Sequence, residues 1–166
     1  MRKIHAMTLI LGAVLAATAN SATTTATFAV TETVLATCSA TATALAFNPY
    51  TPGGGAIANS STISVKCSKN TPYTISLNKG TTTGGTVAQR LMASGANTLQ
   101  YNLFTTAAVN VIFGDGSGTS QTETGTGAGV ATANAVTVFG QVPDSAANQA
   151  AVAGNYTDTI TVTVTY

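Results

Sequence analysis

The C-terminal stretch of the chain alternates between apolar and threonine side chains more regularly than any other. Ile160, Val162, Val164 and Tyr166 fall on one face, and threonines occupy the other. Successive side chains of a β-strand point to opposite faces, so a period of two indicates a strand with one buried side. Shorter runs of the same alternation recur upstream, and no helical period is evident after residue 22. The sequence therefore predicts an all-β chain.

Six short strands are expected after Cys38, separated by turns rich in glycine, proline and asparagine. The expected ranges are 41–47, 61–67, 73–79, 99–104, 135–142 and 157–166. Residues 81–97, 114–129 and 143–155 are expected to form loops. This pattern favours an immunoglobulin-like β-sandwich. A complete sandwich of that kind has at least seven strands, so six strands leave one groove unfilled.

A further strand pattern lies ahead of the first cysteine. Phe28, Val30 and Val34 share one face of an extended segment, and Glu32 is the single charged residue on that face. A strand there can pair with its own domain or with a neighbouring copy. The functional interpretation depends on which of the two it does.

The first residues have the form of a secretory signal. Arg2 and Lys3 precede a short apolar run, 7–17, that ends in small residues, with cleavage sites after Ala19, Ser21 or Ala22. The sequence thus predicts a signal peptide over 1–22, an N-terminal extension over 23–36 and one β-sandwich domain over 37–166. An exported chain is expected to oxidise its only cysteines, Cys38 and Cys67, to a disulfide.

Charge and composition exclude several classes of function. Without residues 1–22 the chain keeps four of its six cations against five acids, so it has no basic surface for nucleic acid. Its one histidine, His5, lies in the signal, which removes most zinc and Ser-His-Asp chemistry. Asp115 with Glu123 could form a glycosidase pair or a calcium loop, but an Asp-Gly turn in a solvated loop is the favoured interpretation. We therefore expect no catalytic residue, cofactor or metal site, and no enzymatic activity.

An ordered set of short motifs covers nearly all of the chain after the signal. They are Phe28-x-Val30-x-x-x-Val34-x-x-x-Cys38, Leu45-x-Phe47, Tyr50-Thr51-Pro52, Ile63-x-Val65-x-Cys67, Pro72-Tyr73-x-Ile75-x-Leu77-x-x-Gly80, Arg90-x-Met92, Leu99-x-Tyr101-x-Leu103, Phe113-Gly114-Asp115-Gly116, Val138-Phe139-Gly140 and Gly154-x-Tyr156-x-Asp158-Thr159. With this set the chain resembles the spore coat protein U domain family, which includes subunits of archaic chaperone–usher pili. It departs from the family pattern at Phe113, where tryptophan is frequent, and at Glu32, where an apolar or small residue is usual.

The resemblance implies a sandwich that cannot close alone. A periplasmic chaperone would lend a strand to the groove, an outer-membrane usher would exchange it, and the extension of the next pilin would take its place. Phe28, Val30, Glu32 and Val34 would be the donated residues. The strand carrying Ile160, Val162, Val164 and Tyr166 would flank the groove and meet the chaperone. Arg90 and Asp158, both in the matched pattern, could form an ion pair.

The resemblance further implies export through the periplasm to a pilus on the cell surface, where a fimbrial polymer serves adhesion and biofilm formation. One alternative is a structural protein of a spore or cell coat that uses the same module. Another is a self-complete β-sandwich adhesin or lectin, in which residues 25–34 fold back as the seventh strand. A stable monomer of the mature chain would favour the last of these.

Overall fold

The computed structural model describes residues 19–166. The signal peptide expected over 1–22 therefore falls almost wholly outside the described residues. The chain divides into two units, the first ending at Thr33 and the second running from Val34 to Tyr166. Residues 19–37 form neither helix nor strand. Within the described range, no helix is long and apolar enough to cross a membrane.

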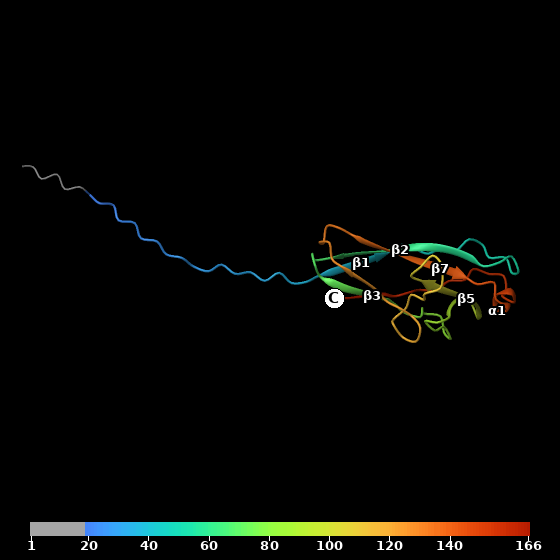
Figure 1. Ribbon diagram of the computed structural model, residues 1–166. Helices are drawn as coiled ribbons and strands as arrows, with labels where there is room; N and C mark the ends of the chain where they lie inside the picture. Colours follow the sequence, from blue (N-terminus) through green and yellow to red (C-terminus); the bar gives the residue numbers. More distant parts are fainter. Residues whose placement is uncertain (1–18) are drawn as a thin grey trace, which may run out of the picture. The chain divides into compact units, whose positions relative to one another are not determined.

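The second unit is a sandwich of two antiparallel sheets, so the all-β prediction is confirmed (Figure 1). The larger sheet has the order β1-β2-β7-β5-β4, and the smaller has the order β6-β3-β8. Their bounds are β1 Cys38–Ala42, β2 Ile57–Cys67, β3 Pro72–Leu77, β4 Arg90–Ser94, β5 Asn97–Phe104, β6 Glu123–Thr126, β7 Asn134–Val142 and β8 Val162–Thr165. One short helix, α1 Ala146–Gln149, lies between β7 and β8.

The sandwich has two distinct ends. The start of β1 and the C terminus lie at one end, which we call the basal end, and α1 lies at the other, the apical end (Figure 1). The disulfide between Cys38 and Cys67 joins the first residue of β1 to the last residue of β2, as expected for an exported chain. It therefore fastens the edge strand at the basal end.

Alternate residues of the strands make one core between the sheets. Its buried apolar members are Ile63, Val65, Cys67, Tyr73, Ile75, Leu77, Leu99, Tyr101, Leu103, Phe113, Val138 and Val142. The period-two pattern in β2, β3 and β5 is therefore the packing pattern of the core.

The structure has eight strands where six were predicted, because two strands have no apolar alternation. β4 begins with a fully buried arginine, Arg90, and its other residues are half-buried. β6 consists of Glu123, Thr124, Gly125 and Thr126, and it was predicted to be part of a loop. A Cβ at Gly125 would lie 2.4 Å from the ring of Tyr73, so the glycine is needed where the ring packs on the strand. Both strands therefore form through pairing with neighbouring strands, and neither has a hydrophobic alternation of its own.

Three further predictions were wrong in their details. The strand predicted over 157–166 is regular only over β8, and residues 158–161 before it are irregular. The strand predicted over 41–47 ends at Ala42, and the chain beyond it is irregular. The loop predicted over 143–155 contains α1. Its buried residue Asn148 makes hydrogen bonds to the main chain of β5 of the kind that a neighbouring strand would make. Its amide accepts from the Gln100 N–H at 2.8 Å and donates to the Gln100 carbonyl at 2.9 Å. A single side chain thus satisfies the β5 main chain at Gln100, before Asn102, the first residue of β5 that pairs with β7.

Candidate functional site

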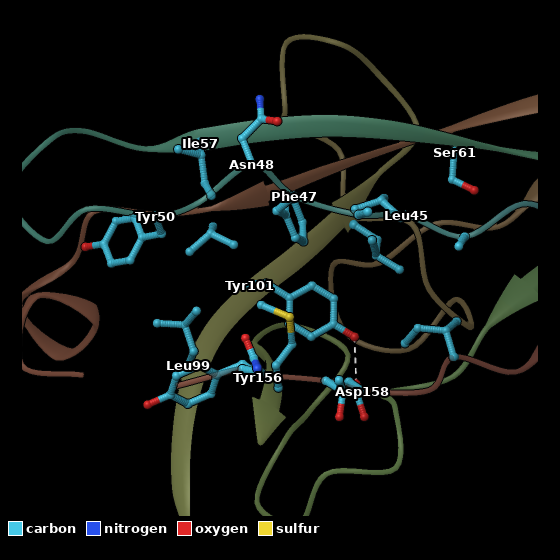
Figure 2. Close-up of a pocket in the computed structure, with 18 of the residues that line it drawn as sticks. Leu45, Phe47, Asn48, Tyr50, Ile57, Ser61, Leu99, Tyr101, Tyr156 and Asp158 are labelled. Atoms are coloured by element: carbon cyan, nitrogen blue, oxygen red, sulfur yellow. Dashed lines mark hydrogen bonds between the residues drawn. The ribbon is translucent and has the colours of Figure 1, made fainter. Parts of the chain in front are cut away.

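A groove of about 980 Å³ opens along the side of the sandwich (Figure 2). One wall is the irregular segment 43–50 after β1, which we call the β1 lip. The other is the segment 156–162 that leads into β8, which we call the β8 lip. Every residue that lines the groove belongs to the second unit of the chain. The groove is therefore a property of the sandwich itself.

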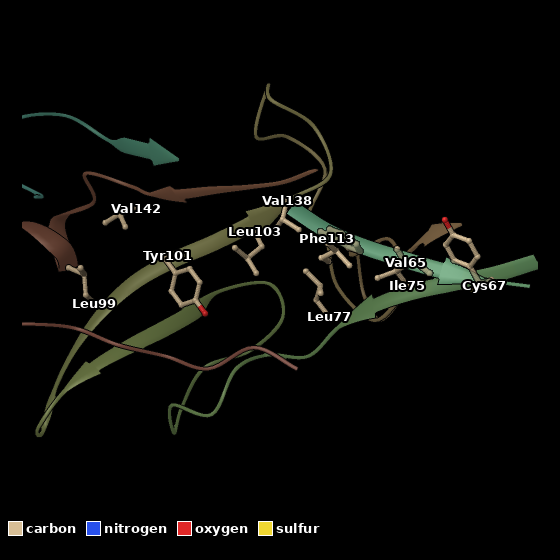
Figure 3. Packing of buried hydrophobic residues seen from close by; sticks show 12 residues of the cluster. Val65, Cys67, Ile75, Leu77, Leu99, Tyr101, Leu103, Phe113, Val138 and Val142 are labelled. Carbon is tan, nitrogen blue, oxygen red and sulfur yellow. The ribbon is translucent and has the colours of Figure 1, made fainter. Parts of the chain in front are cut away.

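The groove exposes the inside of the core. Its floor includes the buried side chains of Leu77, Leu99 and Tyr101, which Figure 3 shows in a row with the rest of the core. The lips carry apolar side chains that pack on this core but are only half-buried. These are Leu45, Phe47 and Tyr50 on the β1 lip and Tyr156, Ile160 and Val162 on the β8 lip. An apolar strip that is half-covered from both sides is a core with one element missing.

The main chain of the β8 lip is bonded on its outer side. Thr157 exchanges two hydrogen bonds with Ala93 of β4, at 2.9 and 3.0 Å. The Asn78 N–H donates to the Thr161 carbonyl at 3.2 Å, and the Thr161 N–H donates to Asn78 Oδ1 at 2.9 Å. Main-chain groups alternate in direction along a strand, so those of Ile160 and Val162 point the other way, toward the groove. The β8 lip presents a free strand edge to an apolar channel.

The carboxylate of Asp158 anchors the middle of the β8 lip. It accepts from the N–H groups of Thr81 and Thr82, at 2.9 and 3.0 Å, and from the Tyr101 hydroxyl at 2.6 Å. The close fit requires glycine at position 80, where φ is 90° and a Cβ would lie 1.9 Å from Asp158 Oδ2. Partial burial opposes ionisation, but the bonds from Tyr101 and Thr82 hold the pKa of Asp158 below its usual value. Burial and the bond to Asp158 in turn raise the pKa of Tyr101.

Arg90 supports the same region from inside the core. Its Nε and Nη2 donate to the Asn78 carbonyl at 3.0 and 2.8 Å, and Nη2 also donates to the Phe113 carbonyl at 2.9 Å. Burial lowers the pKa of Arg90, and the nearby charges of Asp115 and Asp158, with Tyr101, oppose that shift. The ion pair considered from the sequence is not formed: Arg90 holds carbonyl and amide oxygens, and Asp158 holds hydroxyl and N–H groups. Both nevertheless serve the β8 lip, Asp158 directly and Arg90 through Asn78.

A second carboxylate, Asp144, ties the end of the β1 lip to the chain just after β7. Asp144 accepts from the Tyr50 hydroxyl and from the N–H groups of Gly53 and Gly55, both at 3.0 Å. The hydrogen bond from Tyr50 lowers the pKa of Asp144, while partial burial and the same bond raise the pKa of Tyr50 to about 12. Because Asp144 lies two residues after the end of β7 and Tyr50 ends the β1 lip, this contact fixes the end of the β1 lip against the end of β7.

The structure places the site residues expected from sequence in three different settings. Phe28, Val30 and Val34 are almost fully exposed, and Glu32 accepts from the Thr33 N–H at 2.9 Å. No strand forms at 25–34, where the self-complete alternative requires one. Ile160 and Val162 are half-buried and line the groove, Val164 is half-buried beyond it, and Tyr166 is exposed.

The loop that contains Asp115, considered above as a metal or glycosidase site, forms an Asp-Gly turn. Asp115 accepts from the Ser117 N–H at 2.9 Å, which is an Asx turn. Among residues 19–166 no cluster of three or more acids, histidines and cysteines could hold a metal ion. The residues that the sequence analysis missed are those of the β1 lip, since Leu45 and Phe47 were assigned to a strand.

Comparison with known proteins gives two similarities. The model of the Spore Coat Protein U domain family matches residues 24–163. Among solved structures, this chain is 28% identical, with a TM-score of 0.56, to a chain of the chaperone–tip adhesion subunit pre-assembly complex (CsuC–CsuE) from archaic chaperone–usher Csu pili of Acinetobacter baumannii. The similarity covers 81% of this chain and 41% of that one, so this chain spans less than half of its length. No curated protein matches.

Replacing Asp158 by asparagine should loosen the β8 lip. One charged acceptor with five donors becomes a neutral amide, so we expect the free energy of unfolding at neutral pH to fall by about 1–3 kcal/mol. Because folding lowers the pKa of Asp158, its contribution is complete above the ordinary value of 3.8 and is lost as the pH falls through the lowered pKa. Urea unfolding of wild type and Asp158→Asn at several pH values measures this difference.

The matched control is Asp115→Asn, in the exposed turn, where asparagine can form the same turn and little change is expected. Equal effects of the two substitutions, or a difference that does not shrink in acid, would contradict the assigned role of Asp158.

Proposed function

The chain belongs to the Spore Coat Protein U domain family, and from that premise we propose that it is a structural pilin of a chaperone–usher fibre. In this proposal each subunit lays its N-terminal extension into the groove of the next. The observation that carries the proposal is the groove, which joins a half-covered apolar core to a free strand edge. These are the two features that an added β-strand satisfies, through main-chain hydrogen bonds and side chains in alternate pockets.

The extension has the matching pattern. Phe28, Val30 and Val34 are exposed in the subunit, and their burial in a neighbour's groove would contribute about 5–8 kcal/mol. The main chain of the extension would bond to Ile160 and Val162 on the β8 lip. The segment from Phe28 to Val34 has the same number of residues as the β8 lip from Tyr156 to Val162. An extended strand of that length spans about 20 Å. One extension therefore fills one groove.

The ends of the sandwich favour one direction for the donated strand. The extension leaves its own body at the basal end, where β1 starts and where β1 and β8 come close together. A donor that entered from the basal end would bring its body to the place occupied by the chain's own extension. A donor whose body lies at the apical end avoids this conflict and leaves the two neighbours at opposite ends. The donated strand then runs antiparallel to the β8 lip, with Phe28 toward the basal end and Val34 toward the apical mouth.

Such head-to-tail pairing does not close on itself, so it produces a linear polymer. Before assembly, the free edge that includes Ile160, Val162 and Val164 would be covered by a strand of a periplasmic chaperone. The solved complex to which this chain is similar, a chaperone with a pilus subunit, supports that partner. An outer-membrane usher would exchange chaperone for extension, and the fibre on the cell surface would serve attachment and biofilm formation. A coat protein built from the same module remains the alternative and would polymerise in the same way.

The polymer is tested by heat-labile ladders on gels of the mature protein. Wild type should give a ladder of multimers that collapses to monomer on boiling, and deletion of residues 23–35 should abolish it. The matched pair Val30→Asp and Thr31→Asp places the same charge on opposite faces of the extension. Only the former faces the groove, so only Val30→Asp should weaken or abolish the ladder. A monomeric wild type, or a ladder that the deletion leaves intact, would exclude intermolecular donation of this strand.

Glu32 should weaken the polymer, because among residues 19–166 the only charged residue that lines the groove is the acid Asp158. In the polymer the charge of Glu32 would be buried among apolar groups, and Asp158 would repel it. Replacing Glu32 by valine removes both of these costs. We expect Glu32→Val polymers to need a higher temperature for dissociation, which gel ladders sampled over a temperature series measure. Glu32→Gln, which removes the charge but keeps the size, should fall between the two. Dissociation of Glu32→Val at a lower temperature than wild type would show that Glu32 has a favourable partner in the groove.

A further inference from the structure

Large apolar side chains that remain exposed are confined to a few places. Among residues 19–166 they are Phe28, Val30, Val34, Leu35, Val130, Val152 and Tyr166. The first three belong to the face of the extension that the groove would cover. Of the other four, Leu35, Val130 and Tyr166 lie outside the groove at the basal end of the sandwich, and Val152 lines the groove mouth at the apical end. We propose that these ends form a second contact between consecutive copies of this chain, apart from the groove.

The basal end holds three of the four. Leu35, 79% exposed, lies just before β1, and Tyr166, 58% exposed, follows the Thr165 that pairs with Thr74 near the start of β3. Val130, 58% exposed, follows Gly129, whose N–H donates to the Cys67 carbonyl at 3.1 Å. Hydrogen bonds and the disulfide therefore place Val130 and the start of β1 at the same end of the sheet. The basal end presents an apolar rim around the point where the extension leaves.

The apical end holds the fourth, on a loop that is held in place. Val152, 57% exposed, sits at the groove mouth beyond Ala151. Its carbonyl accepts from the Tyr156 hydroxyl at 2.6 Å, and the Ala151 N–H donates to the Asn148 carbonyl at 3.1 Å. The loop is thus tied both to the β8 lip and to α1. Val152 remains exposed although the loop that carries it is anchored.

The length of the linker brings the two ends together. This step rests on the proposed strand donation, in which Val34 lies at the apical mouth of the acceptor. Only residues 35–37 separate Val34 from Cys38, where the donor's own sandwich begins. Four extended residues span about 13–14 Å at most. The start of the donor's β1, at the basal end, must therefore lie within that distance of the acceptor's mouth, where Val152 is.

The chemistry of the two ends is compatible with contact. Apolar side chains meet apolar side chains, so their burial is favourable. The acid near the mouth is Asp144, while the basal turn between β2 and β3 carries Lys69, so the end charges are of opposite sign. A second copy of this chain is the occupant that supplies both features at the required distance.

Disulfide trapping in the assembled polymer tests this contact. The full mature chain with Leu35→Cys and Val152→Cys keeps Phe28, Val30, Glu32 and Val34, and the native cysteines are bonded to each other. After mild oxidation, most of the ladder should survive boiling without reductant and collapse with it. A second pair, Val130→Cys with Val152→Cys, tests the same contact from another element. The control pair, Leu35→Cys with Thr137→Cys, places the second thiol on an exposed residue in the middle of β7 and should stay heat-labile.

The outcomes separate this contact from strand donation. Heat-labile ladders that neither test pair makes heat-stable, or that the control pair stabilises equally, would overturn the end-to-end contact and leave strand donation standing. Absence of any ladder from the wild-type chain would overturn strand donation and, with it, this inference.

Discussion

The free main-chain edge of the β8 lip is the feature on which the rest of the structure depends. In an antiparallel sandwich an uncovered edge beside an uncovered core is unfavourable twice, through unpaired peptide groups and through exposed apolar surface. Here both occur along one channel, with Ile160 and Val162 supplying main-chain groups as well as half-buried side chains. A single added strand removes both costs at once. The segment expected to bind this groove most favourably is therefore an extended one with apolar residues at alternate positions. The chain's own N-terminal extension has this pattern.

Three of the charged residues hold this groove in shape. Asp158 fastens the middle of the β8 lip, Arg90 holds the Asn78 main chain to which Thr161 is bonded, and Asp144 fastens the end of the β1 lip through Tyr50. In an enzyme, buried or perturbed charges of this kind would suggest catalysis. Here each is hydrogen-bonded to neighbouring backbone, hydroxyl or amide groups, so these charges hold the lips in place within the subunit itself. Preorganisation of the groove lowers the cost of ordering it when a strand binds.

The alternation of Ile63, Val65 and Cys67, and of Leu99, Tyr101 and Leu103, was enough to predict the sheets, because these side chains pack in a core with a period of two. It could not predict β4 or β6, because Arg90 and Gly125 fit contacts with residues distant in sequence: Arg90 bonds the Asn78 and Phe113 carbonyls, and Gly125 packs against Tyr73. Nor could it predict the β1 lip, since Leu45 and Phe47 alternate like strand residues yet pack beside an empty position. Ile160 and Val162, which the C-terminal alternation put on one face, both line the groove. The alternation of residues along one segment does not show whether a strand has a neighbour on both sides. The groove exists because the β8 lip lacks a neighbour on one side, so the sequence pattern could not predict it.

Hydrogen exchange at the main-chain amides of Ile160 and Val162 tests the central claim most directly. In the unpolymerised sandwich lacking residues 23–36, these amides should exchange with little protection, while those of Thr161 on the same lip and Thr163 in β8 are protected by Asn78 and β3. In the assembled polymer all four should be protected. Protection of Ile160 and Val162 already in the isolated sandwich would mean that the edge is covered from within, and the account of an open groove awaiting a donated strand would be wrong.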